Sequence, residues 1–169
     1  MYSDVIVFHP SVGGETYEQS PNFQIYGYPK NVFPPTDFHT ATFIPSLNAI
    51  IIFGNMSSSK ADRELAGRGV TPVYLLKVGT WEIEKKETVG DGPGIIYKHE
   101  AELQDGVLRI TSVDSRWDKT ARMVFKDGKS KTEDVEYGEA WNLDLSSWVW
   151  TRKVSEWTTV PKKRRGRGR

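Results

Sequence analysis

The chain has 169 residues, enough for one domain with a substantial buried core. Hydrophobic residues make up 37% and aromatic residues 12%, which excludes a wholly disordered chain, and the absence of cysteine excludes disulfides, cysteine zinc sites and a thiol nucleophile. The net charge of +1 is uneven, because six of the last eight residues are basic and the remaining 17 basic and 22 acidic residues give the body a charge of −5.

Secretory and membrane-spanning signals are absent from the sequence. The first ten residues lack a basic region followed by a sustained apolar stretch, so no secretory signal is visible. The longest apolar run, Ala49–Phe53, is far too short to cross a bilayer. We therefore expect an intracellular protein, cytoplasmic or nuclear, with no membrane association.

Short apolar and β-branched runs separated by turn signals predict strands in the first half of the chain at residues 5–8, 23–26, 39–44 and 49–53. Residues 55–72 break this rhythm with serines, charges and Gly67 and Gly69, and predict a loop. Strands are expected to resume at residues 73–78, 81–86, 95–103, 107–113, 121–125, 132–137, 141–145 and 148–153.

Two dipeptides among these runs are strong turn signals. Asp105-Gly106 predicts a tight hairpin between residues 95–103 and 107–113, and Asp127-Gly128 predicts a second hairpin further on. Many short strands with regular turns and almost no helix indicate an all-β protein, either a sandwich, a barrel or a propeller.

An internal repeat favours the propeller. Residues 73–86 align without gaps with residues 140–153, and Trp81 coincides with Trp148. A second repeated element begins at His39 and again at His99. Each histidine precedes a pair of short apolar strands, so the two units have the same internal order.

This order resembles the kelch repeat family, whose blades begin with histidine and small residues, place paired glycines after the second strand, and carry a tryptophan at the fourth. His39 to Lys86 covers one such unit and His99 to Lys153 a second. Here Gly54-Asn55 and Thr111-Ser112 stand at the glycine pair, and Phe23 replaces the first tryptophan.

The resemblance implies a domain over residues 1–160 made of kelch-like four-stranded blades, with a half blade at 1–35 and blades at 36–94 and 95–154. His39 and His99 are then part of the blade framework. Two and a half units are too few to close a ring of four to eight blades. Three outcomes stay open: copies of the chain complete a ring, another chain supplies the missing blades, or the chain closes into a smaller β-fold.

Because the usual work of the family is protein binding, the leading expectation is a non-catalytic scaffold or recognition module that binds another protein or copies of itself. The sequence carries none of the serine-elbow, phosphate-loop or His-Glu-x-x-His motifs, and no metal or other cofactor is expected. The residues singled out for partner contact are Arg63 and Arg68 on the loop 55–72, and Trp117.

The remaining tryptophans divide into two groups. Trp81, Trp148 and Trp150 are expected to pack inside or between blades, whereas Trp141 and Trp157, like Trp117, are open to a place on a binding surface.

Residues 161–169 form a basic tail that is expected to be flexible. Its cations favour nuclear import or non-specific contact with nucleic acid, and they are Lys162, Lys163, Arg164, Arg165, Arg167 and Arg169. A nucleic-acid-associated protein that uses this tail is therefore the first alternative function, and a propeller that handles a small molecule or sugar is the second.

Overall fold

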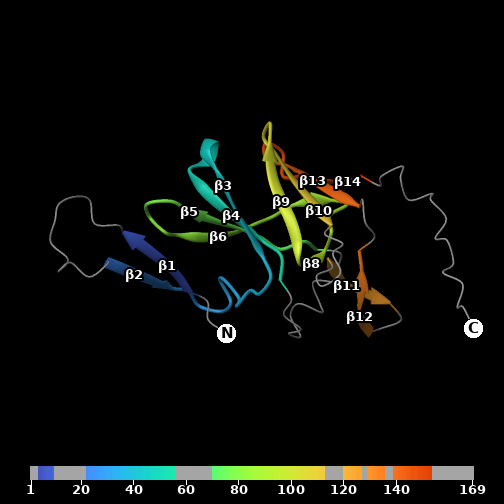
Figure 1. Ribbon diagram of the computed structural model, residues 1–169, viewed down its shortest axis with the longest axis horizontal. Helices are drawn as coiled ribbons and strands as arrows, with labels where there is room; N and C mark the ends of the chain where they lie inside the picture. The colour runs from blue at the N-terminus through green and yellow to red at the C-terminus, as the bar shows by residue number, and fades with distance from the viewer. Residues whose placement is uncertain are drawn as a thin grey trace, which may run out of the picture.

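Strands make up nearly all of the regular structure in the computed structural model of the chain (Figure 1). The structure describes residues 4–9, 22–55, 70–112, 120–126, 129–135 and 139–153. Over these residues the one helical segment is a single 3-10 turn, η1, at Pro45–Leu47. The all-β class predicted from the sequence is confirmed.

The first sheet is a four-stranded antiparallel meander in the order β3-β4-β5-β6. Its strands are β3 Thr40–Ile44, β4 Ala49–Phe53, β5 Val73–Lys77 and β6 Ile83–Lys86. The predicted turn between β3 and β4 is present: η1 forms it, and Asn48 closes it at a φ of 45°. Asparagine tolerates this left-handed conformation better than most residues.

The second sheet repeats this meander and adds a short strand at one edge, in the order β7-β14-β13-β10-β9. Its strands are β7 Val89–Gly90, β9 His99–Gln104, β10 Val107–Ser112, β13 Ala140–Asp144 and β14 Val149–Lys153. Asp105 and Gly106 form the predicted hairpin turn between β9 and β10, both with positive φ, as a type I′ turn requires.

A three-stranded sheet, β12-β11-β8, flanks the second sheet. Its strands are β8 Ile95–Tyr97, β11 Ala121–Lys126 and β12 Lys129–Asp134. The predicted turn at Asp127-Gly128 lies outside the described residues. The predicted strand over residues 132–137 was wrong at its start, because backbone pairing with β11 continues to Lys126 and Lys129. The first residues of β12, Lys129 to Lys131, are all polar, so the sequence carries no apolar pattern that would predict a strand there.

The sequence also predicts one strand over residues 95–103, and the structure divides it at Lys98. Lys98 has a φ of 57°, outside the β region, and its N–H donates to the carbonyl of Phe38 at 3.3 Å. Tyr97 therefore ends a strand that pairs with β11, and His99 begins one that pairs with β10.

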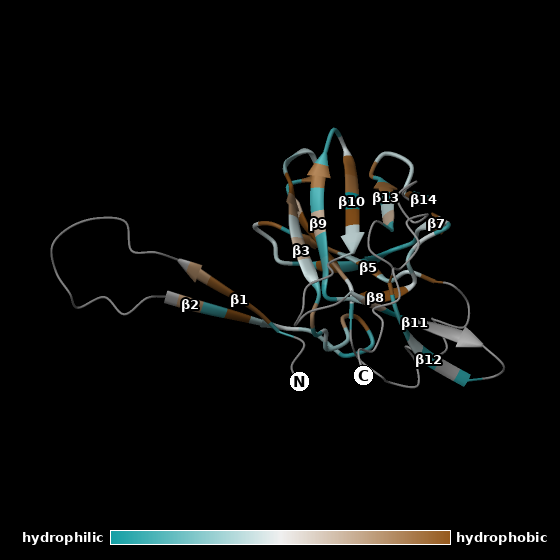
Figure 2. Ribbon diagram, turned by 45° about the vertical axis from the view of Figure 1, so that its right-hand side comes forward, coloured by the Kyte–Doolittle hydropathy of each residue, from teal (hydrophilic) through white to brown (hydrophobic). Residues whose placement is uncertain are grey.

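The fourth sheet is an antiparallel hairpin, β1–β2, formed by β1 Asp4–His9 and β2 Asn22–Gly27. Figures 1 and 2 both show this hairpin projecting from one side of the packed sheets. Figure 2 colours much of β1 as hydrophobic. The hairpin is thus the most protruding regular element in the described part of the chain.

The main core lies between the first and second sheets. Alternate residues of each strand point into it, which matches the two-residue period of a strand. The first sheet contributes Ile51, Phe53 and Leu75, and the second contributes Trp141 and Leu143. A smaller core on the opposite face of the first sheet is formed by Phe33, Ile52, Tyr74 and Leu76.

The two sheets share a repeated turn before their last antiparallel strand. The N–H of Trp81 donates to the carbonyl of Lys77 at 2.9 Å, and the N–H of Trp148 donates to the carbonyl of Asp144 at 2.7 Å. Both tryptophans have positive φ, 57° and 58°, so they lie in the turn and do not open the strand as the sequence predicted. The aligned tryptophans thus mark an equivalent backbone conformation in both sheets.

Candidate protein-interaction surface

The hairpin β1–β2 presents a row of exposed apolar side chains. Its register places Ile6 opposite Ile25 and Phe8 opposite Phe23. All four lie on one face of the pleat and are between 52% and 65% exposed. The rings of Phe8 and Phe23 pack at a centroid distance of 5.3 Å. We refer to these four side chains as the hairpin face.

The other face of the hairpin is packed against the first sheet. Val5 contacts the smaller core, and the rings of Tyr26 and Trp81 lie 5.8 Å apart. The hydroxyl of Tyr28, just beyond β2, donates to the carbonyl of Trp81. These contacts fix the end of the hairpin nearest the body and direct the hairpin face away from it.

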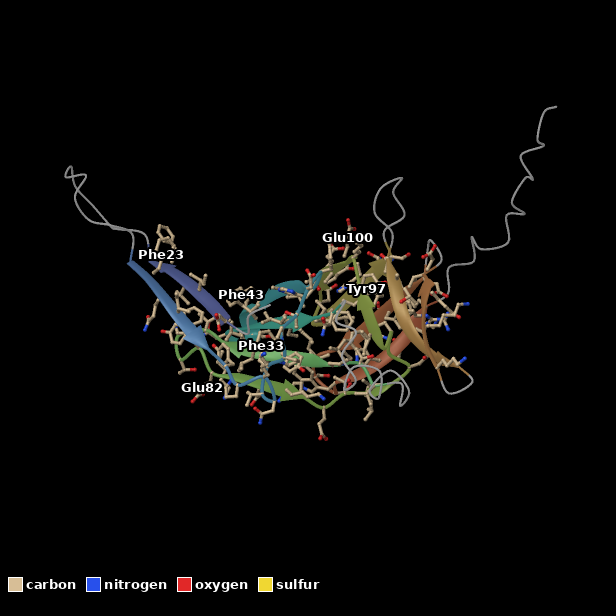
Figure 3. All side chains as sticks on the ribbon, turned by 90° about the horizontal axis from the view of Figure 1, so that it is seen from below. Phe23, Phe33, Phe43, Glu82, Tyr97 and Glu100 are labelled. Carbon is tan, nitrogen blue, oxygen red and sulfur yellow. The ribbon has the colours of Figure 1, made fainter. Side chains whose placement is uncertain are left out.

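The hairpin has two strands where each of the larger sheets has at least four. Within the described residues, neither β1 nor β2 has a further strand beside it. Unpaired N–H and C=O groups therefore line its edges, a feature that proteins usually cover or use for binding. Phe43 on β3 is a further exposed apolar side chain, at 49%, and Figure 3 labels it at a separate position from Phe23.

The outer face of the second sheet has the opposite character. Its strands align Glu102, Arg109, Asn142 and Thr151 in one row, and three of these side chains are exposed while Asn142 is half-buried. The adjacent row toward the β9–β10 turn points into the core and is apolar throughout, with Leu103, Leu108, Leu143 and Trp150. The stack of sheets is thus apolar at its hairpin end and polar at its other end.

A shallow groove of about 620 Å³ opens where the edge strands β3 and β9 meet. Hydrogen-bonding and charged side chains dominate its lining, which consists of Thr40, His99, Glu100, Ala101, Glu102, Arg109 and Thr111. In the register, Arg109 lies opposite Glu102, so the groove carries both signs of charge. It offers polar groups to a ligand, although nothing in its lining selects one chemical class.

His99 has the environment of a framework residue. It is 6% exposed, its Nε2 lies 2.9 Å from Thr40 Oγ1, and its ring packs edge-on against Phe53. Burial, with a smaller contribution from His39, lowers its pKa to about 4. The ring is therefore neutral at pH 7, and its position between two sheets agrees with the framework role expected from the sequence.

His39 is exposed, and its Nδ1 lies 3.2 Å from Thr36 Oγ1. Partial burial lowers its pKa, and the nearby Asp37 opposes that shift. His99 contributes to the lining of the β3–β9 groove, whereas His39 does not.

The tryptophans are distributed differently from the sequence expectation at one position. Trp150 is buried and Trp148 packs half-buried against the main core, as expected. Trp141, considered for a binding surface, is fully buried in the core, with the Arg152 guanidinium 5.8 Å from its ring. The alternation Trp141-x-Leu143-x-Leu145 carries the signal for an inward position.

The residues singled out from the sequence for partner contact lie outside the described part of the chain. This applies to Arg63, Arg68 and Trp117, to Trp157, and to the whole basic tail 161–169. Their roles therefore stay predictions. The hairpin face was not predicted from the sequence, although the uninterrupted run Val5-Ile6-Val7-Phe8 is typical of a strand covered on both sides.

Neither a metal-binding cluster nor a membrane-spanning helix is found in the described residues. Among them, no three histidine, aspartate or glutamate side chains are grouped so that they could hold a metal ion. In the same residues, no helix has the length and apolar character needed to span a membrane.

Comparison with known proteins adds a likeness of fold. No protein-family model matches the sequence, and no curated protein is significantly similar to it. Among solved structures, the chain is similar to the one described as the structure of YjhT, with a TM-score of 0.51 and 15% identity. The match covers 83% of this chain and 43% of that chain, so the present chain spans less than half of the protein it resembles.

Proposed function

We propose that this chain is a non-catalytic protein-interaction module of the kelch-propeller type, in which the hairpin β1–β2 is a half blade whose apolar face is covered by a protein partner. The observation that carries the proposal is the hairpin face, where Ile6, Phe8, Phe23 and Ile25 are each more than half exposed. A contiguous apolar patch beside open strand edges is typical of protein-binding surfaces and is otherwise an aggregation hazard.

The blade interpretation is supported by the repetition in the larger sheets. Each contains an antiparallel meander of four strands, and the turns at Trp81 and Trp148 have the same conformation. The histidines that begin the two units, His39 and His99, each follow a residue with positive φ, Phe38 and Lys98. Compared with these four-stranded units, the two-stranded hairpin β1–β2 is incomplete. A partner that packs on its exposed face would continue the stack of sheets.

Photo-crosslinking at the hairpin face tests the proposal. Phe23 is replaced by p-benzoylphenylalanine, which keeps an aromatic ring at the position, and adducts are collected in cells that make the full chain. We expect a protein adduct that disappears when Phe8→Ser is added. The absence of any protein adduct, whether with another protein or with a second copy, would overturn the proposal.

A further inference from the structure

We infer that the partner at the hairpin face is a second copy of this chain, packed face to face about a two-fold axis. This inference rests on the proposed function, because it names the occupant of the same surface.

The two ends of the stack, the hairpin face and the outer face of the second sheet, are not complementary. Head-to-tail assembly would place the hairpin face of one copy on the outer face of the second sheet of the next. Glu102 and Arg109 would then be buried against apolar side chains, and burying charges in an apolar contact is costly. Two hairpin faces bury only apolar side chains in each other, and such a self-complementary contact generates a closed dimer.

Charge along the hairpin sets the orientation of the two copies. Asp4 is the one ionisable residue on the same face of the pleat as Ile6 and Phe8, and it lies at the end nearest the body. If the hairpins pack antiparallel, the Asp4 carboxylates lie at opposite ends of the interface and do not repel each other. The projecting hairpins in Figures 1 and 2 also allow the two bodies to sit apart in this arrangement.

The area of the face indicates a reversible dimer. Because an aromatic side chain can bury about 150–250 Å², four large side chains that are each more than half exposed offer on the order of 400 Å² per copy. A stable interface of standard size buries about 800 Å² per partner. The face supplies about half of that area, so we expect association that depends on protein concentration.

Light scattering coupled to size exclusion measures the molar mass over a wide range of protein concentration and so tests the inference directly. The wild-type mass is expected to rise from 19.2 kDa toward twice that value as concentration increases. The Phe8→Ser/Phe23→Ser chain is expected to remain a monomer throughout, and circular dichroism checks that it keeps its strands. Should that chain fail to fold, Ile6→Ser/Ile25→Ser provides a second test at the same face.

The matched control lies at the polar end. Arg109 lies on the outer face of the second sheet, which the face-to-face dimer does not use, so Arg109→Ala is expected to leave the molar mass unchanged. A wild-type chain that is monomeric at every concentration, a dimer that survives both serine pairs, or a dimer lost in Arg109→Ala would each overturn the inference. In the photo-crosslinking experiment, an adduct with a different protein alone would overturn this inference and leave the proposed function standing.

Discussion

The imidazole of His99 in β9 is hydrogen-bonded to the hydroxyl of Thr40 in β3, with Nε2 and Oγ1 2.9 Å apart. This contact joins the edge strands of the first and second sheets. The Thr40 hydroxyl also lies within donor reach of the Phe53 carbonyl, at 3.5 Å, which leaves its oxygen to accept the Nε2 proton. In that tautomer Nδ1 is unprotonated, and it is buried without a hydrogen-bond partner among the residues that the structure describes.

The burial of His99 makes stability depend on pH. Its pKa in the folded chain is about 4, below the ordinary value of 6.5, so the unfolded chain binds a proton between these values and the folded chain does not. The stabilisation is present above pH 6.5 and is lost as the pH falls toward 4, by on the order of 3 kcal/mol. Urea unfolding at several pH values across this window measures the loss.

Glutamine at position 99 separates this contribution from other titrations. Its amide can still donate to Thr40, but it cannot be protonated, so His99→Gln is expected to flatten the pH dependence. His39 has a lowered pKa as well and contributes with the same sign, so His39→Gln is measured in parallel. An identical pH profile in wild type and His99→Gln would contradict the prediction.

Gly54 is required by its contact with the same histidine. A Cβ at this position would lie 2.3 Å from His99 Cε1 and 3.0 Å from the Ile96 carbonyl oxygen, and the backbone φ is +96°. Gly54→Ala therefore adds a steric clash to backbone strain. Gly79 is the matched control, because its φ is +98° and nothing lies within 4 Å of its Cβ position.

We expect Gly79→Ala to lower the free energy of unfolding by about 1 kcal/mol through strain alone. Gly54→Ala is expected to cost roughly 2 kcal/mol more, the usual cost of overpacking a rigid contact. Denaturant unfolding of both variants compares the two terms. Equal losses would show that the imidazole moves aside without cost.

Local chemistry predicted the turns well and the strand boundaries less well. Asp105-Gly106 has a left-handed preference that needs no tertiary context, and the hairpin forms where the dipeptide stands. Lys98 adopts a positive φ, although no glycine, asparagine or proline beside it predicts a break in the strand. The break arises because β8 and β9 pair with different strands, which is information that a local pattern does not carry.

The candidate surface was hard to predict for a related reason. Val5 and Ile6 are adjacent apolar residues of the same strand type, yet one packs on the smaller core and the other is 64% exposed. A continuous apolar run predicts that both faces of the strand are buried. Only the packing of the sheets shows which of the two faces is buried within the chain.

The buried indole N–H of Trp150 donates a hydrogen bond to the hydroxyl of Thr88. Trp150 is buried, and its Nε1 donates to Thr88 Oγ1 at 3.1 Å, next to the strand β7 that pairs with β14. Thr88→Val keeps the shape but removes the acceptor, and leaving a buried donor unsatisfied costs about 1–3 kcal/mol. Unfolding of Thr88→Val, Trp150→Phe and the double variant measures the coupling, and strictly additive losses would contradict it.

The response of association to salt distinguishes an apolar interface from a charged one. The hairpin face contains Ile6, Phe8, Phe23 and Ile25, so raising the ionic strength leaves the dimer intact, since salt screens charges and not apolar contacts. The chain does offer an electrostatic route to self-association, between the basic tail 161–169 and a body of charge −5. That route would weaken with salt and would vanish in a chain without residues 161–169. Molar mass measured at low and high salt, for the full chain and the shortened one, therefore separates the two routes. We expect the same degree of association in all four samples. A dimer lost at high salt or on removal of the tail would assign association to the tail.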